Sequence, residues 1–116
     1  MPETSPINVV FYRSKDGACP AERWLDELDT KTRARLLARL AKVRTGNLGD
    51  WSSITDGEGV AELREHFGPG YRIYFGRESN QLIVLLCGSK KSGQKKGIRQ
   101  AVDLWNDWKR RDSGRS

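Results

Sequence analysis

Six consecutive apolar residues, LIVLLC at positions 82–87, constrain the fold of this chain more than any other feature. Side chains alternate between the two faces of a β-strand, so a strand over this run is apolar on both faces. Such a strand is typical of the middle of a sheet. A membrane-spanning helix needs about 20 apolar residues, so the run is too short to cross a bilayer. We therefore expect a globular protein built around a central strand at 82–87.

The segments that precede this strand predict one strand, two helices and a loop. Residues 7–12 (INVVFY) are β-branched and aromatic, which is typical of a strand. Pro20 is expected to open a short helix and Thr30 to cap a second one, so that the two form an antiparallel helical hairpin. The second helix is rich in arginine, and we expect these charges to be solvated. Residues 45–59 are rich in glycine and predict a long loop.

Two alternating strands and a last helix complete the predicted elements. Residues 60–67 and 71–76 alternate in polarity, and a Gly-Pro-Gly turn at 68–70 joins them. Residues 93–110 carry an apolar stripe at helical spacing. The predicted order is β-α-α-β-β-β-α, which gives an α+β fold with a mostly antiparallel twisted sheet, a helical hairpin and a C-terminal helix.

The whole chain, residues 1–116, is expected to form one domain with flexible ends at 1–6 and 112–116. We expect the helices to cover one face of the sheet and to leave the opposite face partly open. Strand alternation predicts which polar side chains lie on that open face. They are Arg64, His66, Arg72 and Tyr74.

The formal net charge of +6 is concentrated in the second half of the chain. Residues 1–58 hold 9 Lys+Arg and 9 Asp+Glu, whereas residues 59–116 hold 12 and 6. This asymmetry favours an anionic partner for the second half, such as a nucleic acid, a membrane surface or an acidic peptide. Residues 1–6 lack the basic and then apolar pattern of a signal peptide, so we expect a cytoplasmic protein.

Two cysteines and one histidine are too few for a disulfide framework or a histidine-based metal site. Cys19 and Cys87 have no CxxC spacing, and Cys87 lies within the apolar run, where we expect it to be buried. The sequence therefore predicts a reduced protein that needs no metal ion or other cofactor.

Four sequence motifs together resemble the RelE/ParE superfamily of bacterial toxins. They are GNLGD at 46–50, ELR at 62–64, GPGYRIYF at 68–75 and LLCGSKKS at 85–92. The combination is most similar to the branch of addiction-module killer proteins, which is related to the HigB-type toxins. The resemblance covers nearly the whole chain, and it implies a RelE-like fold with the element order predicted above.

The resemblance implies the toxin of a type II toxin–antitoxin system, neutralised by a small antitoxin that is often a helix-turn-helix protein. Most similar toxins cleave mRNA on the ribosome without a metal ion, so the ribosome and mRNA are the expected partners. The ParE branch instead inhibits DNA gyrase, and the fold alone does not distinguish these activities. A third alternative is a degenerate toxin that only binds its antitoxin.

Metal-free cleavage of RNA by its own 2′-hydroxyl requires stabilisation of charge at the phosphate, and arginines supply it. The resemblance assigns this role to Arg64 and Arg72, and strand alternation independently places both on the same face. The alternative is that each arginine only pairs with Glu62 or Glu65 on a solvated face.

The basic residues after the apolar run form a second candidate group. Lys90 and Lys91 lie between the central strand and the last helix, where exposed backbone N–H groups favour a phosphate. In similar toxins this junction supplies catalytic or RNA-binding residues, and the alternative is a solvated cluster of charges. Lys95, Lys96 and Arg99 extend the patch, and we expect them to contact ribosomal RNA.

Cleavage also needs a group that takes the proton of the 2′-hydroxyl and a group that protonates the leaving oxygen. A histidine titrates near neutral pH, so His66 is a candidate, with a solvated histidine as the alternative. Glu62 is a second candidate base, unless it only pairs with Arg64. Tyr74 is a candidate for stacking on a base or donating a proton, unless it only packs at the sheet. Some similar toxins carry a catalytic tyrosine or histidine near the last helix, and residues 95–98 offer neither.

Overall fold

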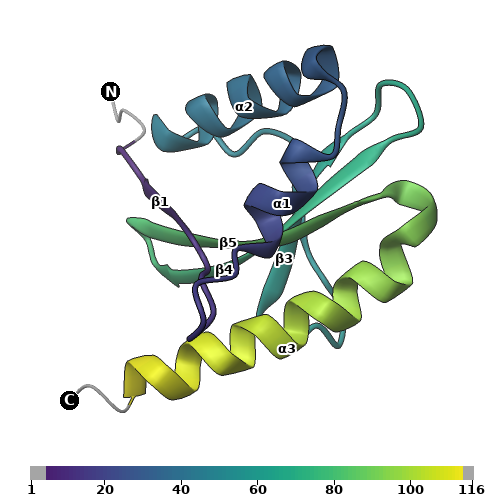
Figure 1. Cartoon of the computed structure of the whole chain (residues 1–116). Coiled ribbons are helices and arrows are strands. Elements are labelled where there is room, and N and C mark those ends of the chain that lie inside the picture. Colours follow the sequence, from purple (N-terminus) through teal and green to yellow (C-terminus); the bar gives the residue numbers. More distant parts are fainter. Residues whose placement is uncertain (1–4, 114–116) are drawn as a thin grey trace.

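Five strands form the sheet at the centre of the computed structural model, which describes residues 5–113 (Figure 1). They are β1 (Asn8–Phe11), β2 (Trp51–Ser53), β3 (Val60–Glu65), β4 (Tyr71–Ser79) and β5 (Leu82–Lys90). Their order across the sheet is β1-β5-β4-β3-β2, with β1 parallel to β5 and every other neighbouring pair antiparallel. The predicted α+β class and mostly antiparallel sheet are confirmed, and the arrangement agrees with a RelE-like fold.

Among the described residues, the α-helices are α1 (Pro20–Asp26), α2 (Thr30–Arg44) and α3 (Gln94–Ser113), and a 3₁₀ turn, η1 (Lys91–Gly93), precedes α3. Pro20 is the first residue of α1, as predicted. Residues 27–29 join α1 to α2, but the two helices point in clearly different directions and do not pack side by side, so the predicted antiparallel pairing is not found (Figure 1). Asp29 rather than Thr30 caps α2, because its carboxylate accepts a hydrogen bond from the Thr32 N–H at 3.0 Å.

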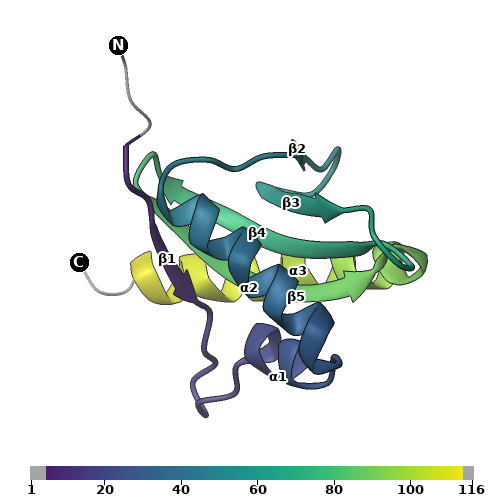
Figure 2. The same ribbon diagram turned by 90° about the horizontal axis from the view of Figure 1, so that it is seen from above.

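Helices cover both faces of the sheet, so the prediction of one covered and one open face is wrong. α1 and α2 pack on one face, and α3 crosses the other (Figure 2). The apolar run at 82–87 needs both layers, since each of its two apolar faces is removed from water by a different layer. The main buried residues are Leu25, Leu36, Leu40, Ile73 and Leu85 on the α1–α2 side, and Tyr74, Val84, Leu86, Ala101 and Trp105 on the α3 side.

The predicted loop at 45–59 contains β2, a short edge strand that pairs Trp51 with Leu63 of β3. A strand of three residues in a stretch rich in glycine and serine is too short for an alternating pattern to reveal. β2 continues the sheet beyond β3 and brings the end of the preceding loop into contact with it. The Arg64 N–H donates to the Asp50 carbonyl at 2.9 Å.

α3 runs to Ser113, so the first two residues of the end predicted to be flexible, 112–116, are helical. Residues 1–4 and 114–116, which make up most of the two predicted flexible ends, lie outside the described residues. Within residues 5–113, no helix has the length and apolar character needed to span a membrane.

Candidate functional site

The register of the three middle strands places the candidate side chains in two neighbouring rows. Glu62 of β3 lies opposite Tyr74 of β4. In the next row, Arg64 of β3 lies opposite Arg72 of β4, which in turn lies opposite Ser89 of β5. Since residues two apart on a strand share a face, both rows lie on the face that α3 covers. The structure therefore brings together four of the residues predicted to form the site.

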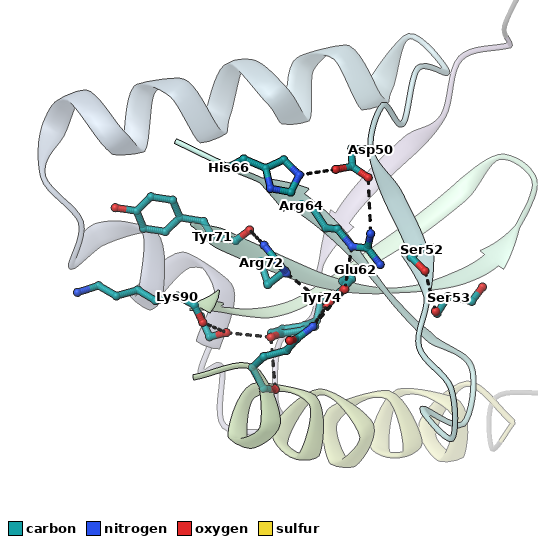
Figure 3. A network of polar contacts seen from close by, with 12 residues as sticks. Asp50, Ser52, Ser53, Glu62, Arg64, His66, Tyr71, Arg72, Tyr74 and Lys90 are labelled. Atoms are coloured by element: carbon teal, nitrogen blue, oxygen red, sulfur yellow. Dashed lines mark hydrogen bonds and ion pairs between the residues drawn. The ribbon is translucent and has the colours of Figure 1, made fainter. Parts of the chain in front are cut away.

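Glu62 is the centre of a polar network (Figure 3). Its carboxylate accepts a hydrogen bond from Arg64 Nε at 3.1 Å and two from Gln94 Nε2, at 2.9 and 3.2 Å. Arg72 Nε lies 3.8 Å from the same carboxylate. Glu62 is only 3% exposed, and a buried carboxylate needs such hydrogen bonds and opposite charges. The pairing of Arg64 with Glu62, one alternative from the sequence, is present.

Arg72 is buried, which contradicts the prediction that it lies on an open face. Its side chain is 6% exposed, because α3 covers this part of the sheet. One terminal nitrogen donates to the Tyr71 carbonyl at 3.1 Å, while the buried Nε has no hydrogen-bond partner among the described residues. A buried donor without a partner costs about 1–3 kcal/mol, so burying Arg72 in this position lowers the free energy of unfolding.

Tyr74 is also buried, so the prediction that it lies on an open face is wrong, whereas the alternative that it packs at the sheet is present. Its hydroxyl lies 2.8 Å from Ser89 Oγ and donates to the Gln94 carbonyl at 3.5 Å. Burial raises the pKa of Tyr74 to about 12, so the phenol is neutral at physiological pH. The ring and hydroxyl connect β4 to β5 and to the first turn of α3.

The network reaches the surface through Arg64, Asp50 and His66. The Arg64 side chain is 35% exposed, and its NH1 lies 3.9 Å from Asp50 Oδ1. The other carboxylate oxygen, Oδ2, lies 2.6 Å from His66 Nε2. This hydrogen bond is the main cause that lowers the pKa of the Asp50 carboxyl. The His66 side chain is 68% exposed, in agreement with the prediction. Its carboxylate partner, Asp50, was not predicted from the sequence.

Arg39 of α2 fixes the loop that carries Asp50. Its guanidinium donates to the carbonyls of Leu48, Asp50 and Arg64 at 2.7, 2.8 and 2.8 Å, and it forms an ion pair with Glu65. The side chain is only 10% exposed. The prediction that the arginines of this helix are solvated is therefore wrong for Arg39, which the loop covers.

The basic junction between β5 and α3 is exposed, as predicted. The Lys91 N–H donates to the Gly70 carbonyl at 2.9 Å, which places the junction beside the turn between β3 and β4. Within residues 5–113, none of the five basic side chains of the junction forms an ion pair. These side chains are Lys90, Lys91, Lys95, Lys96 and Arg99.

The described residues contain no group of three or more His, Cys, Asp or Glu side chains that could hold a metal ion. Cys19 and Cys87 are buried free thiols, which confirms the prediction for Cys87. Burial raises the pKa of the Cys87 thiol to about 12, so it remains protonated and unreactive.

Four residues of the network had no role in the sequence-based prediction: Arg39, Asp50, Gln94 and Ser89, the last within the LLCGSKKS motif. Asp50 ends the GNLGD motif, and Gln94 lies two positions after the LLCGSKKS motif, so the motifs of the resemblance were the available signal for both. No sequence signal separates Arg39 from the other arginines of α2, because its burial depends on the loop that folds over it.

Comparison with known proteins relates this site to a family. The family model of the phage-derived Gp49-like proteins (DUF891) matches residues 23–105, which include the whole polar network. The chain is also 41% identical over 81 residues to an uncharacterized protein of Haemophilus influenzae, a match that covers 69% of this chain and 80% of that protein. The Gp49-like family is associated with RelE-like toxins of toxin–antitoxin systems, and this context suggests an antitoxin as partner. The chain belongs to the phage-derived Gp49-like family.

Proposed function

We propose that this protein is the toxin of a type II toxin–antitoxin module and that it cleaves mRNA on the ribosome without a metal ion. The observation that carries the proposal is the polar network that runs from buried Glu62 through Arg64 to Asp50 and His66 at the surface. It joins an oriented guanidinium to an exposed imidazole, and RNA cleavage by the 2′-hydroxyl uses both kinds of group. The association of the family with toxins supports the same function.

Arg64 is proposed to stabilise the phosphate at the cleaved bond. Its Nε is bound to Glu62, which orients the guanidinium, and the side chain as a whole is 35% exposed. Arginine suits this task because it remains charged and offers a fixed fork of donors. Lys90 and Lys91 are proposed to bind the same RNA strand, since both are exposed at the β5–α3 junction.

Glu62, Arg72 and Tyr74 are proposed to hold this arrangement rather than to contact RNA. As whole residues they are 3%, 5% and 0% exposed, so an RNA strand on the surface does not reach them. The second arginine has an electrostatic purpose, because it shares the Glu62 carboxylate with Arg64 and offsets part of its negative charge. With Asp50 included, two arginines balance two carboxylates, and Arg64 is proposed to bind a phosphate through its terminal nitrogens, which donate no hydrogen bond among the described residues.

The remaining basic residues are proposed to bind the ribosome. Lys95, Lys96 and Arg99 lie exposed on the first turns of α3, next to the junction lysines. Such a cluster binds nucleic-acid backbones without reading their sequence. The partner that neutralises the toxin is proposed to be a small helix-turn-helix antitoxin.

The proposal is tested by inducing the chain in a bacterial host and mapping the 5′ ends of cellular mRNA. Growth should stop, and new ends should appear within translated codons. Arg64→Ala should abolish the cuts, because the phosphate loses its oriented guanidinium. Arg77→Ala is the matched control, since Arg77 is an exposed arginine of β4 outside the network. Both variants should still bind the antitoxin, which shows that they fold.

Three outcomes contradict parts of the proposal. Cutting by Arg64→Ala at the wild-type rate would overturn the site. Inhibition of gyrase supercoiling without any cut mRNA would replace the proposal with a ParE-like activity. Normal growth of the induced cells would indicate a protein that only binds its antitoxin.

A further inference from the structure

One carboxylate joins the two exposed groups of the network. Asp50 Oδ2 is bonded to His66 Nε2 at 2.6 Å, and Asp50 Oδ1 lies 3.9 Å from Arg64 NH1. Arg64 and His66 are two residues apart in sequence, with His66 just past the end of β3, and the side chains of both contact the one Asp50 carboxylate. A phosphate bound to Arg64 therefore lies within reach of the imidazole.

The hydrogen bond to Asp50 determines which imidazole nitrogen is basic. The pKa of Asp50 is lowered, chiefly by its hydrogen bond with His66, so its carboxylate is ionised at neutral pH and only accepts hydrogen bonds. In the neutral imidazole, Nε2 must therefore carry the proton that it donates to Asp50. Nδ1 then keeps its lone pair, and among the described residues it has no hydrogen-bond partner. Nδ1 is thus free to accept a proton from a substrate.

Asp50 is held more firmly than a typical exposed residue. Its carbonyl accepts hydrogen bonds from the Arg64 N–H at 2.9 Å and from Arg39 at 2.8 Å. Exposed ion pairs between flexible side chains contribute little to stability, and the side chains of this pair are 68% and 47% exposed. A fixed carboxylate behind an exposed imidazole fits the orientation of a base better than the stabilisation of the fold.

We propose that His66 is the general base of the RNA cleavage and that Asp50 is the residue that positions it; this inference rests on the function proposed above. The 2′-oxygen forms a bond to phosphorus while the bond from phosphorus to the 5′-oxygen breaks, which gives a 2′,3′-cyclic phosphate and a 5′-hydroxyl. His66 Nδ1 takes the proton of the 2′-hydroxyl. The leaving 5′-oxygen takes a proton from water, and the imidazolium returns its proton to the hydroxide formed.

The test measures single-turnover cleavage of mRNA on programmed ribosomes as a function of pH. His66→Gln should lower the rate about 10²–10³-fold and change the dependence of the rate on pH. The charged groups around the imidazole are the Asp50 carboxylate, Arg64 on β3, and the Arg39–Glu65 pair on the far side of the loop. All of them remain in the His66→Gln variant, but the Asp50 carboxyl loses the imidazole that lowers its pKa, so the profile of Asp50→Asn is measured beside it to separate the two contributions.

A double-mutant cycle separates positioning from general stability. Asp50→Asn should slow the wild-type protein about tenfold or more, yet change the rate of the His66→Gln variant by less than about twofold, since its effect passes through the imidazole. Asp26→Asn, an exposed aspartate of α1, is the matched control and should leave the rate unchanged. Urea unfolding and antitoxin binding show whether the Asp50 variant is folded.

The outcomes distinguish this inference from the function on which it rests. Absence of cleavage by the wild-type protein overturns both. Cleavage by the wild type together with an unchanged rate for His66→Gln overturns only the role of His66. An equal loss from Asp50→Asn with and without His66 overturns the positioning role of Asp50.

Discussion

Gly97 of α3 lies directly against the ring of Tyr74. A β-carbon at position 97 would come within 2.7 Å of Tyr74 Cε2 and 3.0 Å of Ser89 Oγ. Glycine inside a helix costs about 1 kcal/mol relative to alanine. Here the missing side chain lets the first turns of α3 approach the sheet closely enough for the Tyr74 hydroxyl to reach the Gln94 carbonyl. Gly97 therefore determines how closely α3 packs over the candidate site.

Gly97→Ala is expected to destabilise the protein, although alanine is the better helix former. The ring of Tyr74 is fully buried and cannot move aside, so the added methyl group should cost about 1–3 kcal/mol. Urea unfolding at neutral pH measures the change. Gly93→Ala is the control, because its β-carbon would meet only Ser89 Cβ at an ordinary 3.7 Å. A Gly97→Ala variant more stable than wild type would show that the contact is not tight.

The free energy of unfolding is expected to fall as the pH rises from 10.0 to about 12. Tyr74 loses its proton at an ordinary pKa in the unfolded chain, but only at about 12 in the folded protein. The unfolded state therefore binds fewer protons in this window, and its population grows as the pH rises. The loss from Tyr74 should be about 2 kcal/mol, and it should be absent below pH 10.0.

Urea unfolding of wild type and Tyr74→Phe at several alkaline pH values checks this expectation. The variant should show a shallower decline, because its ring has no proton to lose. Part of the decline should remain, since burial also raises the pKa of Cys87 to about 12. Equal declines in the two proteins would mean that Tyr74 is not protected from ionisation.

Arg39→Ala is expected to lower the free energy of unfolding by about 2–3 kcal/mol. The change leaves three carbonyls and the Glu65 carboxylate without their donor. Arg39→Lys should recover less than half of the loss, because a single ammonium cannot replace the planar fork. Arg44→Ala, an exposed arginine near the end of the same helix, should change the stability by less than about 0.5 kcal/mol. Urea unfolding compares the variants. Similar free energies of unfolding for Arg39→Ala and Arg44→Ala would show that the contacts of Arg39 with the loop do not stabilise the fold.

Strand alternation predicts the side of the sheet on which a polar residue lies, but not what covers that side. The parity of β3 and β4 correctly places Arg64, Arg72 and Tyr74 together. Burial depends instead on where α3 packs, which is a contact between segments distant in sequence. The apolar run at 82–87 held the missing information, because a strand apolar on both faces is typically covered on both.

The contact between Asp50 and His66 could not be predicted, because it depends on β2. That strand has only three residues, and without it no pattern places position 50 next to position 66. The burial of Arg39 depends on the same loop. In both cases the residues are visible in the sequence. Whether they come into contact depends on how an edge strand pairs and on the path of the loop before it.

Binding of single-stranded RNA is expected to weaken steeply with salt. If about five of the basic residues at the β5–α3 junction meet phosphates, the logarithm of the affinity should fall with the logarithm of the salt concentration at a slope of about −3.5. Lys90→Ser combined with Lys91→Ser should make this slope shallower by about 1.4, because two phosphates lose their partners. Lys31→Ser combined with Lys42→Ser removes the same charge from exposed positions on α2 and should leave the slope unchanged. Filter binding between ~0.05 and ~0.3 M salt measures the slopes. An equal effect of the two double variants would mean that net charge, rather than the junction, attracts the RNA.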